Sequence, residues 1–178
     1  MIKRAAALAS DLHDGQLRRD GTPFIHHCEA VFNLLRDIGV SNPYVLAAAW
    51  LHDSLEECDI SRAYLAHIFD DYLASIVAAL TRDVSPSEYI QRIRNSSYEV
   101  KIIKIADTLH NCQCLDSGLR PGTISRKCFD CSEAIFELAE ELSPYYALLL
   151  REYLRPYMKK NNEKSHISPT IKNHQTPL

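Results

Sequence analysis

The spacing of apolar positions along the chain is helical almost throughout. Apolar residues recur three or four positions apart, few stretches alternate apolar with polar residues, and only five glycines interrupt the 178 residues. Cap and breaker residues divide the pattern into helices that we expect over 2–13, 26–38, 43–51, 61–69, 71–81, 86–94, 98–114, 123–142 and 144–158. The pattern therefore predicts an all-α protein.

The stretch Val45–Leu51 is apolar on every side, which predicts a central, buried helix. It is followed at once by His52 and Asp53 and then by Glu56 and Glu57. Four ionisable groups at the end of a buried helix conflict with simple core packing. Conflicts of this kind mark candidate functional sites.

The helical periodicity ends near residue 158. Residues 159–178 hold four lysines, two prolines, several asparagines and no aromatic residue. We therefore expect one domain over 1–158 and a disordered tail over 159–178. Within the domain, residues 14–25 carry two glycines and a proline and predict a loop.

Composition narrows the class of protein. Twenty Lys and Arg against 23 Asp and Glu leave a net charge of −3, too balanced for a protein that binds nucleic acid mainly by neutralising phosphates. No run approaches the roughly 20 apolar residues of a membrane span, and the N-terminus lacks a signal-peptide pattern. We expect a cytoplasmic globular protein with no nucleic-acid or membrane partner, and the sequence sets no oligomeric state.

The six cysteines have two spacings that zinc sites also use, Cys112-x-Cys114 and Cys128-x-x-Cys131. Both pairs fall in segments with helical periodicity, and no βαβ pattern surrounds the second pair. We therefore favour buried, inert thiols.

A different set of residues has the composition of a metal site. Two imidazoles and two carboxylates, from His27, His52, Asp53 and Asp107, form a mixed nitrogen and oxygen donor set suited to Mn²⁺, Fe²⁺ or Zn²⁺. His26 precedes His27, and by chemistry alone either could be the ligand.

Further polar groups stand one helical turn after three of these candidates. The pairs are His52 and Glu56, Asp53 and Glu57, and Asp107 and Asn111. A carboxylate on the turn next to a metal could orient the bound water or take its proton. The alternative is that these groups are a solvated helix end and polar neighbours; we interpret His110 as such a neighbour and His13 as a histidine at a helix C-terminus.

The predicted loop adds two cations and an aromatic ring shortly before His27. Arg18 and Arg19 could bind phosphate bidentately or stack on a base, and Phe24 follows them. Alone, the two arginines predict a solvated pair. Beside a metal site they indicate an anionic substrate, most simply a nucleotide.

Three motifs resemble one known family. They are His-x-Gly-Gln-x-Arg-Arg-Asp-Gly-Thr-Pro-Phe-Ile-His-His at 13–27, Ala-Ala-Ala-Trp-Leu-His-Asp-x-x-Glu-Glu at 47–57 and Lys-Ile-Ala-Asp-x-Leu-His-Asn at 104–111, with Thr-Arg-Asp at 81–83 between the last two. In order and spacing they are similar to the HD-domain hydrolases of RelA/SpoT homologues, above all the small stand-alone alarmone hydrolases. The similarity covers about residues 5–145.

The resemblance implies an HD-domain helical bundle and hydrolysis of guanosine 3′-diphosphate 5′-di(tri)phosphate, (p)ppGpp, to GDP or GTP and pyrophosphate. It implies Mn²⁺ as cofactor, held by His27 rather than His26 together with His52, Asp53 and Asp107. Glu56 and Glu57 would then activate the attacking water. The substrate-binding residues expected from the matching motifs are Arg18, Arg19, Phe24, Lys104 and Asn111.

The chain departs from the family pattern at several positions. Phe24 replaces a common Tyr, Cys28 a Pro and Glu57 an Asp, while Gln113 and Cys114 stand where the family often has Arg and Thr that help bind substrate. Two rival functions therefore accompany the main prediction. One is an HD phosphatase or nucleotidase acting on another nucleotide, such as NADPH or a deoxynucleotide; the other is a non-catalytic nucleotide-binding module.

Overall fold

The computed structural model describes residues 1–118 and 126–152, with side chains for 1–112 and 134–152. Its helices are α1 (Ile2–Leu12), α2 (Ile25–Asp37), α3 (Pro43–Leu51), α4 (Ser54–Glu57), α5 (Arg62–Ile68), α6 (Asp71–Leu80), α7 (Pro86–Asn95), α8 (Tyr98–Gly118) and α9 (Arg126–Leu142). Residues 144–152 are also helical, and the described residues contain no β-strand. The all-α prediction is confirmed.

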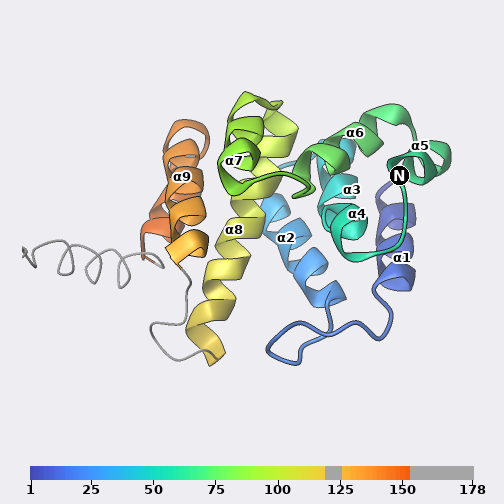
Figure 1. The fold of residues 1–178 in the computed structure, drawn as a ribbon, viewed down its shortest axis with the longest axis horizontal. Coiled ribbons are helices and arrows are strands. Elements are labelled where there is room, and N and C mark those ends of the chain that lie inside the picture. Colours follow the sequence, from blue (N-terminus) through green and yellow to red (C-terminus); the bar gives the residue numbers. More distant parts are fainter. Residues whose placement is uncertain (119–125, 153–178) are drawn as a thin grey trace, which may run out of the picture.

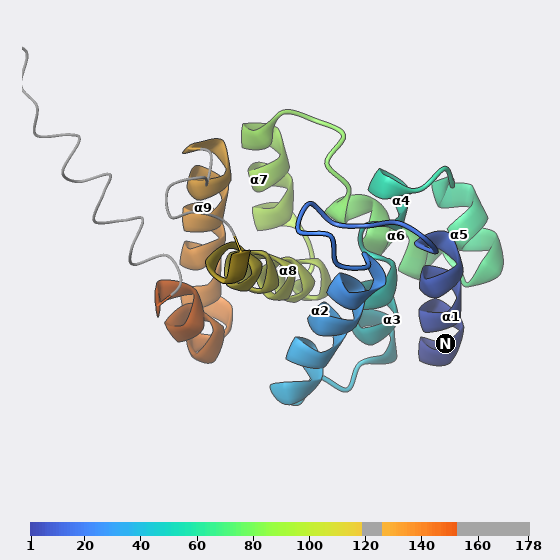
Figure 2. The same ribbon diagram turned by 90° about the horizontal axis from the view of Figure 1, so that it is seen from below.

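Helix α3 lies at the centre of one half of the molecule, as its apolar surface predicts. It packs against α1, α2, α6 and α8 (Figures 1 and 2). Ala47, Ala48 and Ala49 are fully buried, and their small side chains let the neighbouring helices approach from several directions. The C-terminal end of α3 is therefore surrounded by protein, and the residues that follow it enter a crowded site.

Helix α8 connects this half to the rest of the fold. It runs beside α2 on one side and α9 on the other, and α7 packs near both α8 and α9 (Figures 1 and 2). Ile102, Ile103, Ile105 and Leu109 are fully buried along α8. A polar residue between these positions, such as Asp107, is consequently carried into the interior.

Local capping explains why several helices begin where the sequence predicts. The side chain of Asn42 accepts a hydrogen bond from the Tyr44 backbone N–H at 2.9 Å, just before Pro43. Ser61 and Asp70 cap α5 and α6 in the same way. These caps depend only on neighbouring residues, so the sequence predicts them well.

The turn that follows α3 and the end of α8 are the main departures from the predicted helices. Helix α3 ends at Leu51, His52 and Asp53 form a turn, and α4 begins at Ser54, whose hydroxyl donates to the Leu51 carbonyl at 2.6 Å. The expected one-turn pairs of His52 with Glu56 and Asp53 with Glu57 therefore do not lie on one continuous helix. Helix α8 also continues to Gly118, past the predicted end at 114.

The domain boundary predicted at 158 and the tail over 159–178 lie outside the described residues. Within the part of the chain that the structure describes, no helix combines the length and the apolar character that crossing a membrane requires.

Candidate metal centre and substrate pocket

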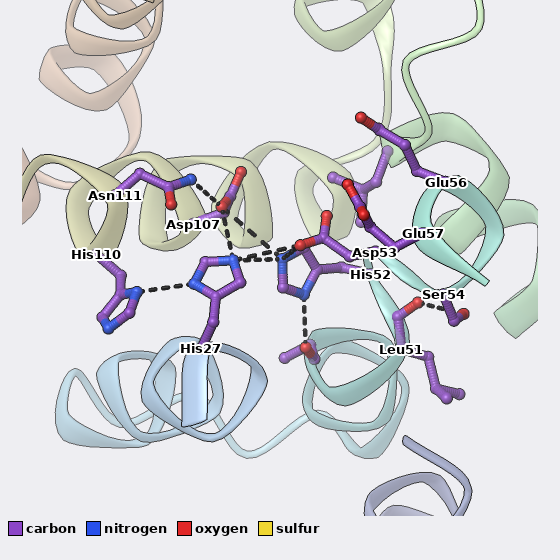
Figure 3. A network of polar contacts seen from close by, with 12 residues as sticks. His27, Leu51, His52, Asp53, Ser54, Glu56, Glu57, Asp107, His110 and Asn111 are labelled. Carbon is purple, nitrogen blue, oxygen red and sulfur yellow. Dashed lines mark hydrogen bonds and ion pairs between the residues drawn. The ribbon is translucent and has the colours of Figure 1, made fainter. Parts of the chain in front are cut away.

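Four side chains converge from three parts of the fold (Figure 3). His27 comes from the first turn of α2, His52 and Asp53 from the turn between α3 and α4, and Asp107 from the middle of α8. His27 Nε2 lies 3.1 Å from His52 Nε2, 3.4 Å from Asp53 Oδ2 and 3.2 Å from Asp107 Oδ1. His52 Nε2 lies 3.2 Å from the same Asp53 oxygen and 3.8 Å from the Asp107 oxygen.

These separations fit a shared divalent cation. Ligand atoms about 2.1 Å from one ion stand roughly 3.0–3.5 Å apart in octahedral or tetrahedral geometry. The mixed set of imidazole nitrogens and carboxylate oxygens suits a transition metal. His27 is 2% exposed whereas His26 is exposed, so the geometry selects His27 of the two adjacent histidines. His27, His52 and Asp53 form a site able to hold a divalent metal.

Each histidine is oriented through its second ring nitrogen. His52 Nδ1 donates to the Ala49 carbonyl at 2.8 Å, which leaves the Nε2 lone pair directed into the cluster. His27 Nδ1 lies 2.7 Å from His110 Nδ1. Burial, followed by the charges of His27 and Arg18, lowers the pKa of His110 to about 4, so His110 is neutral at pH 7 and can accept the His27 N–H.

His110 is thus more than the polar neighbour that the sequence indicates. Nothing in its local pattern distinguishes it from a solvated residue, because the contact joins α8 to α2. Two sequence features point toward it: His110 belongs to a run of polar groups in an otherwise apolar helix, and it is part of the motif at 104–111.

Asp107 is fixed by two donors. Lys104 Nζ donates to Oδ2 at 2.6 Å, and Asn111 Nδ2 donates to Oδ1 at 2.6 Å. Arg18 Nη2 in turn donates to Asn111 Oδ1 at 2.8 Å. Burial alone would raise the pKa of Asp107, but the Lys104 ammonium and the neighbouring histidines hold it well below the usual range.

The same opposition of burial and charge acts on His52 and Asp53. Burial would lower the pKa of His52, but Asp53 and Asp107 raise it well above the ordinary histidine value. Burial would raise the pKa of Asp53, while His52 and His27 lower it. Without a metal, these shifts favour ionised carboxylates and a protonated His52 ring, so the Nε2 lone pair becomes available to a metal once that second proton leaves.

A pocket of about 520 Å³ opens over the cluster. Its size falls within the range of roughly 300–1,000 Å³ typical of small-ligand sites. The predicted site residues that line it are Arg18, Arg19, Phe24, His27, His52, Asp53, Glu56, Glu57, Lys104, Asp107 and Asn111. The other lining residues, to which the sequence analysis assigns no role, are Gln16, Leu17, Asp20, Leu80, Arg82 and Tyr89.

The two glutamates have different partners. Glu56 accepts from the Arg82 backbone N–H at 2.9 Å, and its two oxygens also face the Arg82 guanidinium, with Nη2 at 2.8 Å. Glu57 accepts from Gln16 Nε2 at 3.3 Å. In the view of Figure 3, both lie on the Asp53 side of the cluster, opposite His110.

The loop before α2 places the two arginines at the pocket. Arg18 N–H donates to the Thr22 carbonyl at 2.8 Å and the Gly21 N–H donates to the Arg18 carbonyl at 2.9 Å, which closes a tight turn. Gly21 has a φ of +84°, a conformation that side chains disfavour. This turn holds Arg18 and Arg19 over the cluster, although the two lie far from Asp107 in the sequence.

Phe24 packs inward from the end of this loop. Its ring stacks on His13 with centroids 4.6 Å apart and meets His27 edge-on at 5.9 Å. His13 does end α1, as predicted, but it is 2% exposed rather than a surface histidine.

The side chains of three of the six cysteines are described, so the prediction of buried, inert thiols is tested for those three. Cys28, Cys58 and Cys112 carry free thiols, and burial raises the pKa of Cys28 to about 12, which makes that thiol inert. Cys114, Cys128 and Cys131 lie outside the described side chains, as does Gln113.

Comparison with known proteins places the fold and site in a family. Residues 5–149 match the model of the HD domain. The chain therefore belongs to the HD domain family, whose proteins bind a divalent metal.

Its relatives lie in the RelA/SpoT branch that the sequence motifs indicate. The chain is 31% identical to mouse MESH1, a guanosine-3′,5′-bis(diphosphate) 3′-pyrophosphohydrolase, over 65% of this chain and 69% of that protein. It is 34% identical to a probable guanosine-3′,5′-bis(diphosphate) 3′-pyrophosphohydrolase of Synechocystis, over 66% of this chain but only 17% of that protein. The predicted family is confirmed, and the chain spans less than a fifth of this longer relative.

The fold is similar to that of a metazoan SpoT orthologue that hydrolyses ppGpp. The two structures align with a TM-score of 0.78 and 24% sequence identity, over 88% of this chain and 94% of the other. This agreement confirms the HD-type helical bundle.

Proposed function

We propose that this chain is a Mn²⁺-dependent (p)ppGpp 3′-pyrophosphohydrolase. It would remove the 3′-diphosphate of guanosine tetra- or pentaphosphate as pyrophosphate and leave GDP or GTP. The observation that carries the proposal is the convergence of His27, His52, Asp53 and Asp107 below a pocket lined by the arginines and glutamates of the same motifs.

The residues of the pocket divide into three roles. His27, His52, Asp53 and Asp107 would hold the metal, which when bound supplies charge neutralisation and a more acidic water. Arg18 and Arg19 stand at the loop above, where guanidinium groups can bind phosphate oxygens bidentately. Phe24, Lys104 and Asn111 complete the proposed substrate-binding set.

The glutamates would manage the proton. A carboxylate near the cluster can accept the proton of the attacking water, and among the described residues Glu57 is contacted by the neutral amide of Gln16 rather than by a cation. Glu56, which is held by Arg82, would help orient that water. We place the enzyme in the cytoplasm, where its nucleotide substrates and reduced thiols are expected.

The direct test is release of pyrophosphate from ppGpp by the purified chain with Mn²⁺. We expect His52→Ala and Asp53→Ala to lose both Mn²⁺ binding and hydrolysis. His67→Ala and Asp59→Ala provide matched controls, because both residues are exposed and lie outside the pocket. Hydrolysis that survives His52→Ala would contradict the assigned site.

A substrate panel separates this proposal from its rivals. Faster release of phosphate from NADPH or a deoxynucleotide than of pyrophosphate from ppGpp would favour another HD phosphatase or nucleotidase. Binding of ppGpp without turnover in the presence of Mn²⁺ would favour the non-catalytic module.

A further inference from the structure

Glu57 is the less constrained of the two pocket glutamates. Glu56 is fixed by an ion pair and a backbone N–H of Arg82, whereas Glu57 is exposed. Among the described residues, Gln16 donates a hydrogen bond to the Glu57 carboxylate. A mobile carboxylate is a poor proton acceptor, because general-base catalysis needs the base within hydrogen-bond reach of one water. The Gln16 contact therefore matters for the proposed chemistry.

The orientation of the Gln16 amide follows from its two partners. A carboxylate only accepts hydrogen bonds, so the Gln16 NH₂ group must face Glu57, at 3.3 Å. The amide oxygen then faces the opposite way, where His13 Nδ1 lies 2.7 Å away. His13 must donate to this oxygen, and doing so prevents the amide from turning over.

His13 is a rigid anchor for this arrangement. It is 2% exposed, and its ring stacks on Phe24 with an interplanar angle of 15°. Its Nδ1 also lies 3.6 Å from Cys58 Sγ, a longer and weaker contact. Its Nε2 is buried with no hydrogen-bond partner among the described residues, so Nδ1 is the ring nitrogen that engages Gln16.

We propose that Gln16 is a positioning residue that holds Glu57 in place as the proton acceptor, with buried His13 fixing the direction of its amide. The inference rests on the proposed hydrolytic function and assigns a role that lies beyond the metal ligands and the phosphate-binding arginines. Gln16 acts through Glu57, so its removal should slow the chemical step and leave substrate and metal binding intact.

Two substitutions at Gln16 test this role. Gln16→Leu removes the amide, and Gln16→Glu keeps its shape and its acceptor for His13 but presents an oxygen to Glu57. General-base catalysis contributes about 10²–10⁴-fold, so loss of positioning should lower kcat for ppGpp by roughly tenfold in both variants. KM and the Mn²⁺ affinity from calorimetry should stay within about twofold of the unmodified chain. Gln91→Leu, on the exposed side of α7, is the matched control.

A double-mutant cycle separates positioning from a general structural effect. If Gln16 acts through Glu57, Gln16→Leu should lower kcat no further in a Glu57→Gln background. Independent, multiplying losses would overturn the inference, as would an unchanged kcat for Gln16→Leu or an effect confined to KM.

Variants of His13 provide a second route if the Gln16 variants fold poorly, as shown by their thermal unfolding. His13→Asn keeps an N–H donor near the position of Nδ1 and should retain most of kcat, whereas His13→Leu should lose it as Gln16→Leu does. Equal losses in these two variants would overturn the anchoring role. An unmodified chain that releases no pyrophosphate from ppGpp would instead contradict the proposed function itself, before any variant is compared.

Discussion

Substitution of His110 tests whether the histidine cluster depends on a residue that is not itself a metal ligand. His110→Phe keeps an aromatic ring beside His27, where the ring centroids are 4.9 Å apart, but removes the lone pair that faces His27 Nδ1. His27 is 2% exposed, so water cannot easily replace the lost acceptor. An unsatisfied buried donor costs about 1–2 kcal/mol, which corresponds to roughly 5–30-fold weaker Mn²⁺ binding at about 1.4 kcal/mol per tenfold.

Isothermal titration calorimetry with Mn²⁺ measures this loss directly. His110→Gln is the informative companion, because its amide oxygen can accept the same N–H and should restore most of the affinity. His67→Phe, on an exposed face of α5, controls for the loss of a histidine elsewhere. A Mn²⁺ affinity for His110→Phe within about twofold of the unmodified chain would refute the reasoning, since partners of ligating histidines typically change metal affinity by about 10–100-fold.

Three further predictions concern His52, Tyr146 and Arg82. Neighbouring carboxylates raise the pKa of His52 despite its burial, so at a pH below that raised pKa Mn²⁺ must displace a proton from His52 in order to bind. Calorimetry should therefore show the Mn²⁺ affinity falling about tenfold for each pH unit below the pKa of His52. Tyr146→Phe removes the hydroxyl that donates to the Leu34 carbonyl and should lower the free energy of unfolding in urea by about 1 kcal/mol. Arg82→Gln breaks an ion pair with Glu56 in which the arginine is 60% exposed, so the free energy of unfolding should change by less than about 1 kcal/mol; a larger loss would mean that the pair supports the fold.

The features predicted best from the sequence are those determined by nearby residues. Asn42 with Pro43, and Ser85 with Glu88, define helix starts through hydrogen bonds within a few positions. The central position of α3 follows from its apolar surface alone. His52, Asp53 and Asp107 stand out as candidate ligands because polar groups in apolar surroundings conflict with local packing rules, which is itself a local signal, whereas the choice of His27 over His26 comes from the family resemblance.

The features missed depend on contacts between distant segments. His110 meets His27 across 83 positions and Gln16 meets Glu57 across 41, so their partners exist only once α2, α4 and α8 are assembled. Arg82 belongs to the Thr-Arg-Asp motif, but its pairing with Glu56 in α4 joins positions that are 26 residues apart. A single sequence contains no local trace of such pairings, since each residue alone is compatible with a solvated surface.

The charges of the pocket connect the metal centre to the choice of substrate. Leaving the histidines aside, its lining holds four cationic side chains and five carboxylates: Arg18, Arg19, Arg82 and Lys104 against Asp20, Asp53, Glu56, Glu57 and Asp107. Three of the four cations already contact pocket groups, since Arg82 pairs with Glu56, Lys104 with Asp107, and Arg18 donates to Asn111. Even with a protonated His52, the protein's own charges thus give the pocket no net positive charge for a polyphosphate, and a bound divalent cation would make the balance positive. Affinity for ppGpp should therefore depend on Mn²⁺ even in a variant that turns it over much more slowly, such as Glu57→Gln, and binding of equal strength with and without Mn²⁺ would show that the arginines suffice.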